Sequence, residues 1–379
     1  MTYYVPDGNF YHYFNLIGIS EDKKTHDPYD SKHTVFYDTF TFDLNIRNNF
    51  FEIIDKRKKQ NLSSEIVYEY SYEGGLGYND LKDYIQFLRN RNFSLDNVKF
   101  IFNLNQTDIR QQLNEQSLQI HNVDMFSASV LRHTEAGINQ FTTKPLIYRD
   151  TRINFLAAQL FQKKSRLEAL HLLYQKGLIQ NAIKGILITP EELERNKDKI
   201  NDSNFYAWLS NNLGPADHVN VHKIPTTQLY TACNGNPYST HIYDQSRVSY
   251  ICETLCEVHA VPDNFITEKT YRPIFNRSPF VLQGSYGQLD FLESIGINTY
   301  QKYTGQHYKN KSNYVQSVVD AAQELLLCTI KYPYDIDNIA EKNQNRINQY
   351  AKHQLEGVKA FLGATNEKVR SKRVRNPFK

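Results

Sequence analysis

Glu268 and Lys269 place an acid and a base side by side within residues 264–270, where the pattern predicts the start of a helix. The first N–H groups of a helix lack intrahelical partners and lie at the positive end of its dipole, which suits a phosphate group. Lys269 would add a full positive charge beside that phosphate, and Glu268 could accept hydrogen bonds from two neighbouring sugar hydroxyls. These residue types at this spacing predict a site for a nucleotide sugar.

The elements on either side of this segment predict where the site lies in the fold. Residues 249–254 read as a strand, and residues 278–284 read as a second strand that ends in a glycine. A strand, a loop, a helix and a further strand form a ligand crevice at the carboxyl ends of an α/β sheet. We therefore expect Glu253, near the end of the first of these strands, to point into the crevice.

The order of these residues resembles the donor-binding signature of the α1,3-fucosyltransferase family and of related glycosyltransferases from viruses and phages. The family pattern is a strand ending in Glu-Asn-Ser, a short loop, Tyr-Val-Thr-Glu-Lys, a helix, and a strand Val-Pro-Val-Val-x-Gly. Residues 249–284 follow this pattern, except that Thr254 stands where the family has asparagine. The first half of the chain has no recognisable acceptor-domain motif, and the resemblance does not imply fucose.

The resemblance implies a fold and a set of roles. The fold is GT-B, in which two Rossmann-like α/β domains face each other across a cleft and a C-terminal helix crosses back. Lys269 would meet the donor diphosphate, Glu268 the ribose, and Glu253 the neighbourhood of the transferred sugar. Transfer with inversion of the anomeric carbon is also implied. Thr267, within residues 265–269, and Arg272, just after them, are further donor-binding candidates.

Arg152 is expected to supply a second cation for the diphosphate. The related family carries a phosphate-binding arginine followed by an aromatic residue and a leucine, and residues 152–156 have these types. Residues 146–148 read as a strand, and Arg152 would open the helix that follows. Arg149 competes for the role, and a surface salt bridge between Arg152 and Asp150 is the alternative. Because cations and a helix dipole can stabilise a leaving diphosphate, we expect no metal and no cofactor beyond the UDP- or GDP-sugar donor.

The catalytic base must lie in the other domain, within hydrogen-bond reach of the acceptor hydroxyl. We expect Glu73 in this role, because it follows the strand-like residues 66–70 and precedes a glycine-rich turn where backbone can approach a ligand. The competing candidates are Glu69, Asp108, His133 and Glu135.

Strands alternating with helices predict parallel sheets covered by helices on both faces. Residues 1–142 are expected to form the acceptor-side domain, 143–330 the donor domain, and 331–379 a terminal helix with a basic tail. The donor half should contain a helix over residues 155–173 and an irregular surface insertion from 196 to 217. Further expected elements are the strands 34–37, 66–70, 98–103, 186–189 and 296–300, the helices 80–90, 288–295, 315–330 and 336–362, and a helix start at Thr189.

Composition narrows the class of protein further. A net charge of +3 does not mark the whole chain as a binder of polyanions. Four scattered cysteines without paired metal-ligand spacing fit a reducing cytosol. Neither a signal peptide nor an apolar stretch of about 20 residues, the length that spans a bilayer, is visible. We therefore expect a cytoplasmic enzyme that is not a membrane protein.

The sequence leaves the acceptor open between two classes. One is a hydroxyl of a glycan or a protein, as in the fucosyltransferases. The other is the hydroxymethyl group of a modified cytosine in phage DNA, a base that would have to be flipped out of the duplex. The composition is rich in Asn, Lys, Ile and Tyr, which resembles that of proteins from AT-rich viral genomes. This composition and the basic residues 368–375 favour double-stranded DNA. Outside the enzymes, the alternative is a non-catalytic protein that binds nucleotide sugars or glycans.

Overall fold

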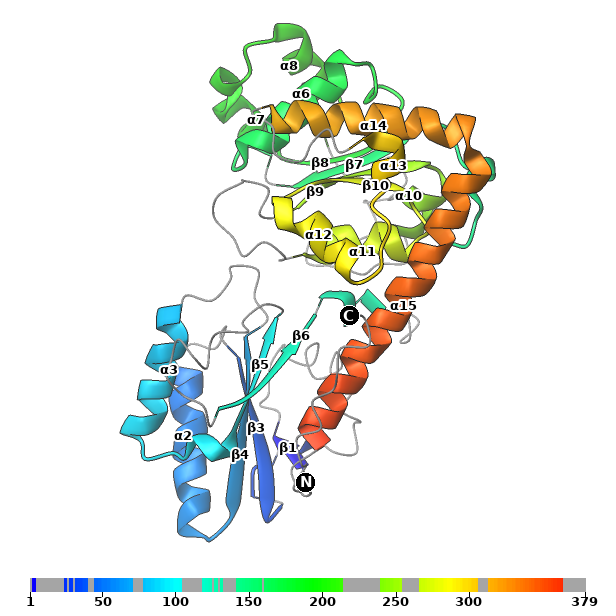
Figure 1. Ribbon diagram of the computed structural model, residues 1–379. Helices are drawn as coiled ribbons and strands as arrows, with labels where there is room; N and C mark the ends of the chain where they lie inside the picture. The colour runs from blue at the N-terminus through cyan, green and yellow to red at the C-terminus, as the bar shows by residue number, and fades with distance from the viewer. Residues whose placement is uncertain are drawn as a thin grey trace. The chain divides into compact units, whose positions relative to one another are not determined.

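The computed structural model describes residues 2–4, 24–25, 27–29, 31–39, 44–70, 78–103, 118–124, 126–128, 130–131, 141–158, 160–213, 239–253, 266–305 and 313–363. These residues divide into two compact units. The first unit takes the described residues within Met1–Arg132 and Ala351–Arg375, and the second takes those within His133–Tyr350. Each unit is an α/β structure built on one parallel sheet (Figure 1). The predicted α/β class is confirmed.

The first unit contains a six-stranded parallel sheet in the order β2-β1-β3-β4-β5-β6. Because β1 lies between β2 and β3 and later strands add in one direction, this order is typical of doubly wound folds. Helices α2 (Leu44–Lys59) and α3 (Tyr78–Asn90) lie on one face of the sheet (Figure 1). The strands are β1 (Thr2–Tyr4), β2 (Lys24–Thr25), β3 (His33–Thr39), β4 (Ser63–Tyr70), β5 (Val98–Asn103) and β6 (Gln119–Val123).

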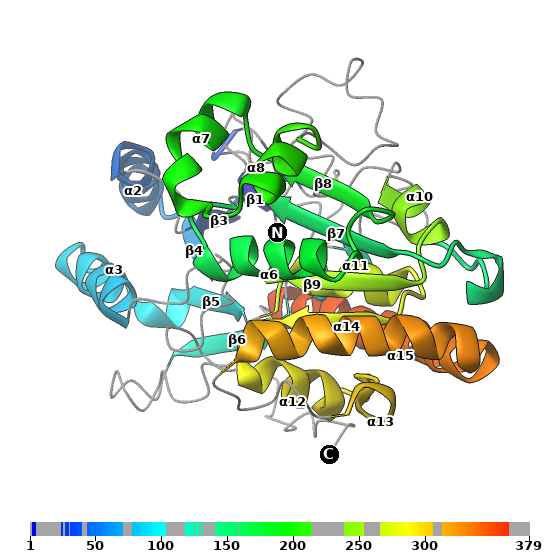
Figure 2. The same ribbon diagram turned by 90° about the horizontal axis from the view of Figure 1, so that it is seen from above.

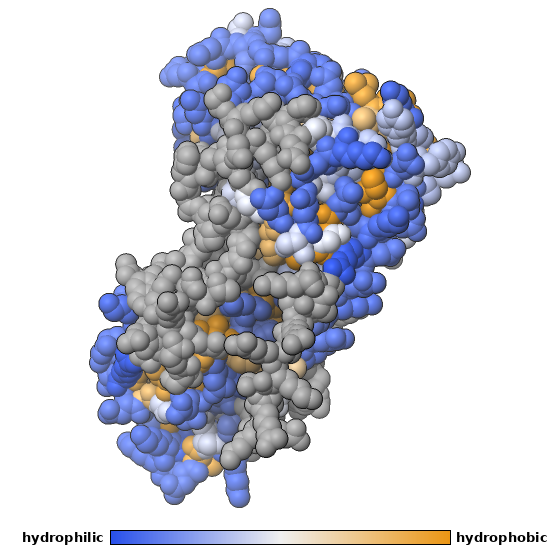
Figure 3. Space-filling view, viewed as in Figure 1, coloured by the Kyte–Doolittle hydropathy of each residue, from blue (hydrophilic) through white to orange (hydrophobic). Residues whose placement is uncertain are grey.

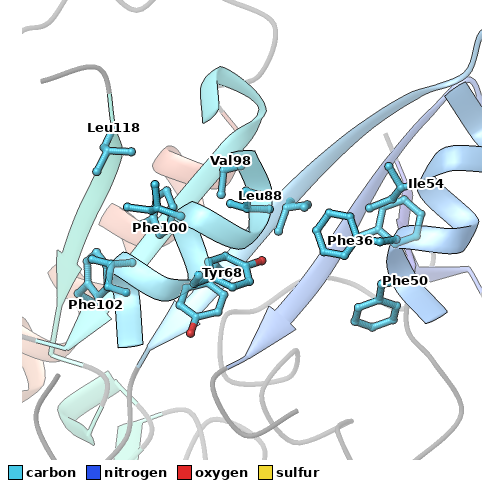
Figure 4. Close-up of a cluster of buried hydrophobic side chains, with 14 residues drawn as sticks. Phe36, Phe50, Ile54, Tyr68, Leu88, Val98, Phe100, Phe102 and Leu118 are labelled. Carbon is cyan, nitrogen blue, oxygen red and sulfur yellow. The ribbon is translucent and has the colours of Figure 1, made fainter. Parts of the chain in front are cut away.

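Aromatic and aliphatic side chains fill the space between this sheet and its two helices (Figure 4). Phe36, Tyr68 and Phe100 come from three neighbouring strands and are almost fully buried. Tyr84 of α3 stacks on Tyr68, with ring centroids 4.0 Å apart. Since side chains of a strand alternate between faces, these residues commit one face of the sheet to the core.

The residues that alternate with this core carry a buried ion pair. Lys99 Nζ lies 3.1 Å from Glu65 Oε1, and the two side chains are 4% and 10% exposed. Lys99 Nζ also donates a hydrogen bond of 3.3 Å to the carbonyl of Leu362, in the last turn of helix α15 (Pro333–Gly363). These contacts hold the end of α15 on the first unit.

The second unit contains a four-stranded parallel sheet in the order β10-β9-β7-β8. The strand order reverses between β7 and β9, and such a switch point opens a crevice at the carboxyl ends of the strands. Helices α6 (Lys164–Gln175) and α14 (Tyr314–Lys331) lie side by side over one face (Figure 2). Helices α11 (Glu268–Phe275) and α12 (Tyr286–Ser294) lie on the other (Figure 1). The strands are β7 (Ile153–Ala158), β8 (Ile183–Leu187), β9 (Val248–Cys252) and β10 (Phe280–Gln283).

Three predicted elements of the second unit are wrong. Leu146–Tyr148 is a 3-10 helix, η3, rather than a strand. The helix expected over residues 155–173 is the strand β7 followed by a loop and α6. Residues 296–300 form no strand and lead into the short helix α13 (Gln301–Thr304). The error at β7 arises because a short apolar run has no periodicity that separates a buried strand from a buried helix.

The irregular insertion expected over residues 196–217 contains helical segments in its described part, residues 196–213. Helix α7 (Pro190–Arg195) starts as predicted, with Thr189 as its cap through a hydrogen bond of 3.1 Å from a backbone N–H. The single turn η4 (Lys197–Lys199) and helix α8 (Ser203–Ser210) follow. Asp202 caps α8 by accepting two backbone N–H groups at 2.9 and 3.0 Å. The polar residues of this insertion thus include helix caps.

Helix α15 supplies residues to both units. Its first part belongs to the second unit and its residues from Ala351 onward to the first. In the second unit, Gln344 Nε2 donates to the carbonyl of Phe275 at 2.6 Å. In the first unit, Gln354 Oε1 accepts from the backbone N–H of Asp124 at 3.0 Å. Each part of the helix is therefore tied to its own unit by side-chain hydrogen bonds.

The visible face of the second unit is mainly hydrophilic, with small hydrophobic patches (Figure 3). Leu327 and Ile330 of α14 are 59% and 53% exposed, whereas the apolar residues of β9 and β10 are buried. Within the described ranges, no helix combines the length and the apolar character that crossing a membrane requires.

Candidate functional site

The carboxyl edge of the second sheet collects the segments that the sequence predicts as a site. Glu253 is the first residue beyond β9, and Gly284 is the first beyond β10. Helix α11 begins at Glu268 with Thr267 as its N-cap, whose Oγ1 accepts from the backbone N–H of Lys269 at 3.3 Å. The matched segment therefore lies beside the switch point between β7 and β9, where ligands bind in sheets of this kind.

Glu268 and Lys269 form an ion pair in the first turn of α11. Lys269 Nζ lies 3.3 Å from Glu268 Oε1, and the side chains of Lys269 and Glu268 are 33% and 15% exposed. Burial is the largest influence on the pKa of Glu268 and raises it, but the charges of Lys269 and Arg272 and hydrogen bonds to the carboxylate together lower it below its ordinary value. The pair thus presents an ionised acceptor and a cation at a partly exposed edge.

Arg272 stands one turn further along α11, on the same stretch of helix as the pair. The residue is 9% exposed, and its charge acts on the Glu268 carboxylate. The Arg272 charge adds to the larger effect of Lys269 in lowering the pKa of the Glu268 carboxyl. The geometry thus gives Arg272 an electrostatic effect on the predicted site.

Glu253 is fully buried, with 0% of the residue exposed. Its Oε1 accepts from the backbone N–H of Thr267 at 3.1 Å and from the hydroxyl of Thr270. Its Oε2 accepts from the hydroxyl of Thr267 at 2.7 Å. The carboxylate predicted to face the donor is thus bonded to the start of α11.

Gly284 occupies a position where a side chain would displace that of Gln288. A Cβ there would lie 1.7 Å from Oε1 of Gln288. That oxygen accepts from the backbone N–H of Ser285 at 2.9 Å, in the first turn of α12. The Gly284 N–H itself donates to the hydroxyl of Tyr314 at 2.7 Å. The glycine at the end of the matched segment therefore permits the tight passage from β10 into α12.

Arg166 is a residue at this edge that the sequence reasoning missed. It lies in the first turn of α6, is 3% exposed, and donates from Nη2 to the carbonyl of Glu253 at 3.0 Å. Helix α6 begins at Lys164, after the N-cap residue Lys163, with no acidic residue in its first turn and no side-chain cap from Lys163. Basic residues oppose the dipole at the start of a helix, so this run is a signal that could have marked the segment.

Arg152 and Arg149 do not join Lys269. Both precede β7, at the amino edge of the sheet and opposite the switch-point edge. Arg152 pairs with Asp150 at 2.8 Å and donates to the carbonyl and side chain of Gln245 at 2.9 and 3.0 Å. Arg149 is 2% exposed, and burial lowers its pKa to about 10. The two arginines were expected at the carboxyl edge because a strand was predicted at residues 146–148. The strand begins instead at residue 153, so both arginines precede it.

An open cavity of about 550 Å³ lies at the same carboxyl edge, on the β8 side. Its lining contains neither Glu268 nor Lys269, so the cavity and the ion pair are separate features. Among the described side chains, no group of three or more His, Cys, Asp or Glu residues is arranged to hold a metal ion. The cavity is lined by Gln162, Glu192, Arg195 and Asn196.

Several predicted residues lie outside what the structure describes. The expected base Glu73 is among them, as is Thr254, the departure from the family pattern. The basic residues 368–375 are also outside the described ranges. Among the competing bases, Asp108, His133 and Glu135 are not described, and Glu69 is described only through its strand backbone.

Comparison with protein-family models gives no match to this chain, and comparisons with curated proteins and with solved structures give none either.

Proposed function

We propose that this chain is a glycosyltransferase that moves a sugar from a nucleoside-diphosphate sugar to an acceptor hydroxyl. The observation that carries the proposal is the Glu268–Lys269 pair, partly exposed in the first turn of α11 beside the switch point of the second sheet. A carboxylate and an ammonium at this place match the two features that UDP- and GDP-sugars share, a ribose diol and a diphosphate.

Each member of the pair has a chemical task in this proposal. The ionised Glu268 carboxylate has two oxygens that can accept the two ribose hydroxyls. Lys269 donates to the diphosphate, where a charge-assisted N–H···O bond is about 2.8 Å long. As the bond between the anomeric carbon and the phosphate oxygen breaks, negative charge grows on the leaving diphosphate. A fixed cation there lowers the barrier because it stabilises this charge more in the transition state than in the ground state.

The acceptor hydroxyl supplies the electrons of the new glycosidic bond and loses its proton to a base. We propose Glu73 for this base, because in the sequence it follows β4 and precedes Gly74 and Gly75, a place that suits a strand-end catalytic residue. A GT-B arrangement is the corresponding fold proposal. Two α/β units with parallel sheets and a helix α15 that supplies residues to both units support it.

The acceptor we propose is the hydroxymethyl group of a modified cytosine in DNA. Its support is the composition and the basic run at residues 368–375. Incubating the protein with a UDP- or GDP-sugar and either hydroxymethylated DNA or a glycan acceptor separates the classes. Sugar incorporated only into the glycan would contradict the DNA proposal and leave the transferase proposal intact.

Donor binding is tested by calorimetric titration with UDP, GDP and their sugars. We expect one of these nucleotides to bind, and Lys269→Ala to weaken that binding by at least about tenfold without changing the fold, since charge-assisted bonds are worth about 1.5–3 kcal/mol. Lys302→Ala is the matched control, because Lys302 lies on α13 beside Tyr303, away from the matched segment. Equal affinities of the wild type and Lys269→Ala would refute the phosphate role.

A further inference from the structure

We infer that Glu253 is a positioning residue rather than a donor contact: its buried carboxylate occupies the start of α11 and so sets the place of Glu268 and Lys269. This inference deepens the proposed function and rests on it for the meaning of the two positioned side chains. The hydrogen bonds of Glu253 that carry the inference stand on the structure alone.

The carboxylate of Glu253 takes the position at the start of α11 that an anion would take. Both of its oxygens accept from this turn: Oε1 from the N–H of Thr267 at 3.1 Å and from the hydroxyl of Thr270, and Oε2 from the hydroxyl of Thr267 at 2.7 Å. An ionised carboxylate only accepts hydrogen bonds, and all of these groups donate. The positive end of the helix dipole adds to the attraction.

Two further N–H groups of this turn also have partners within the protein. The N–H of Lys269 donates to Thr267 Oγ1 at 3.3 Å, and that of Thr270 to the carbonyl of Thr267 at 3.2 Å. The Glu253 carboxylate and these internal bonds thus occupy much of the helix N-terminus that the sequence pattern suggested for a phosphate, and the side-chain cation of Lys269 lies beside it.

The backbone of Glu253 forms hydrogen bonds with two further elements, β10 and α6. Its N–H donates to the carbonyl of Gln283 at the end of β10, at 3.0 Å. Its carbonyl accepts from Nη2 of Arg166 in α6, at 3.0 Å. Gln283 in turn donates from Nε2 to the carbonyl of Ser165 at 3.0 Å. One residue thus joins the ends of β9 and β10 to the starts of α6 and α11.

Complete burial argues against the role expected of Glu253, a position near the transferred sugar. A residue with no exposed surface reaches a donor only if the start of α11 moves away. By contrast, Glu268 and Lys269, which follow directly on the turn that Glu253 holds, are partly exposed. Loss of Glu253 should therefore act on nucleotide binding through the position of these two side chains.

The experiment compares Glu253→Ala with and without added formate, a small carboxylate that fits the vacated place. We expect Glu253→Ala to weaken binding of the nucleotide selected by the wild type by at least about tenfold, and formate to restore part of it. Hydrogen exchange of the backbone amides of residues 267–270, measured without nucleotide, should quicken in the variant and slow again with formate. Unchanged exchange at these amides would overturn the inference.

Asp202→Ala is the matched control, because Asp202 is a carboxylate cap of another helix in the same unit. It should lower thermal stability while nucleotide affinity stays at the wild-type level. Where Glu253→Ala does not fold, Thr270→Val and Thr270→Ser replace it. Thr270→Val removes the hydroxyl that donates a hydrogen bond to Glu253, and Thr270→Ser keeps that hydroxyl. Weakened binding in Thr270→Val with wild-type binding in Thr270→Ser supports the inference, and equal binding in both contradicts it.

The two proposals fail in different ways. If the wild type binds neither UDP nor GDP, the transferase proposal fails, while the exchange measurement still decides whether Glu253 holds α11. If nucleotide binds, Lys269→Ala abolishes binding and Glu253→Ala leaves it unchanged, the donor site stands and the positioning role is refuted.

Discussion

The carboxylate of Glu268 lies where burial and charge act on its pKa in opposite directions. Burial raises the pKa, and Lys269, Arg272 and hydrogen bonds together lower it further than burial raises it. An acceptor of ribose hydroxyls gains from this balance, because only the ionised form offers both oxygens as acceptors. The two cations therefore matter to Glu268 as well as to a phosphate.

Nucleotide binding should persist into acidic solution. The ordinary pKa of a glutamate is 4.5, and because the pKa of Glu268 in the folded protein is lower, more than half of its carboxyl groups are ionised at that pH. Affinity carried by the carboxylate is then present above the folded pKa and lost only as the pH falls through it. Titrations of UDP or GDP at a series of acidic pH values check this for the wild type and Glu268→Gln. The variant should bind more weakly throughout and lack the acid-side loss; the same acid-side loss in the variant would assign it to another group.

A methyl group at position 284 should destabilise the second unit. The Cβ of Gly284→Ala would meet Gln288 Oε1 at 1.7 Å and drive that side chain from its hydrogen bond with Ser285. Overpacking of this kind costs about 1–3 kcal/mol, which urea unfolding can measure. Gly363→Ala is the control, because no atom lies within 4 Å of a Cβ built there. Equal losses in both variants would show that the effect is not local to the β10–α12 passage.

At the scale of elements, the last turn of α15 ends on a buried charge. Lys99 donates to the carbonyl of Leu362 and pairs with Glu65. The carbonyls of a last helical turn lack intrahelical donors, and a cation there also complements the dipole. The pair thus connects a helix end to two strands of the first sheet.

Removing one member of this pair should cost more than removing both. Lys99→Met leaves Glu65 buried without its lysine, which costs about 3–5 kcal/mol in comparable pairs. The double variant Lys99→Met/Glu65→Leu should recover much of this loss, because apolar residues can replace a buried ion pair. Urea unfolding followed by circular dichroism measures both. A double variant no more stable than Lys99→Met would mean that the carboxylate is not what makes the single variant unstable.

At the scale of the whole molecule, the first sheet depends on residues far along the chain. The described end of α15, residues 351–363, packs with the first unit, whereas residues 333–350 pack with the second. His121 of β6 stacks on Phe361 at 5.2 Å between ring centroids, and a Cβ at Gly357 would meet the same histidine at 3.2 Å. Stability of the first unit should therefore require the end of α15.

Deleting residues 351–379 should destabilise the first unit selectively. Trp208 is the single tryptophan and lies in the second unit, so its fluorescence reports the unfolding of that unit alone. Circular dichroism reports both units. We expect the deletion to lower the midpoint seen by circular dichroism and to leave the tryptophan midpoint in place. A parallel fall of both midpoints would show that the second unit also relies on this segment.

Periodic patterns predicted much of the fold correctly. Strands β4 and β5 and helices α3, α14 and α15 lie where alternation and helical periodicity placed them. The pattern failed at β7, a buried strand whose apolar run also fits a helix. Because of that error, Arg152 was predicted at a helix start, although it lies at the amino edge of the sheet. Arg166, which does lie at a helix start beside the site, was not predicted.

The sequence predicted which residues gather at the candidate site better than it predicted their contacts. Glu253, Thr267, Glu268 and Lys269 lie on adjoining segments, as the strand and helix pattern indicated. That the Glu253 carboxylate bonds to the start of α11 could not be predicted, since it depends on how a strand end and a helix start meet in space. No local periodicity records such a distance.

The shared helix α15 has a consequence for synthesis on the ribosome. All strands of the first sheet, up to Val123, are translated long before Ala351. Until then Lys99, which pairs with Glu65, lacks its contact with the end of α15. The uncovered face of the nascent sheet is exposed to chaperones and to other polypeptides. The second unit must be translated before the first can complete its fold. A pause within that interval would lengthen the exposure of the sheet, and a premature stop would release a product prone to aggregate.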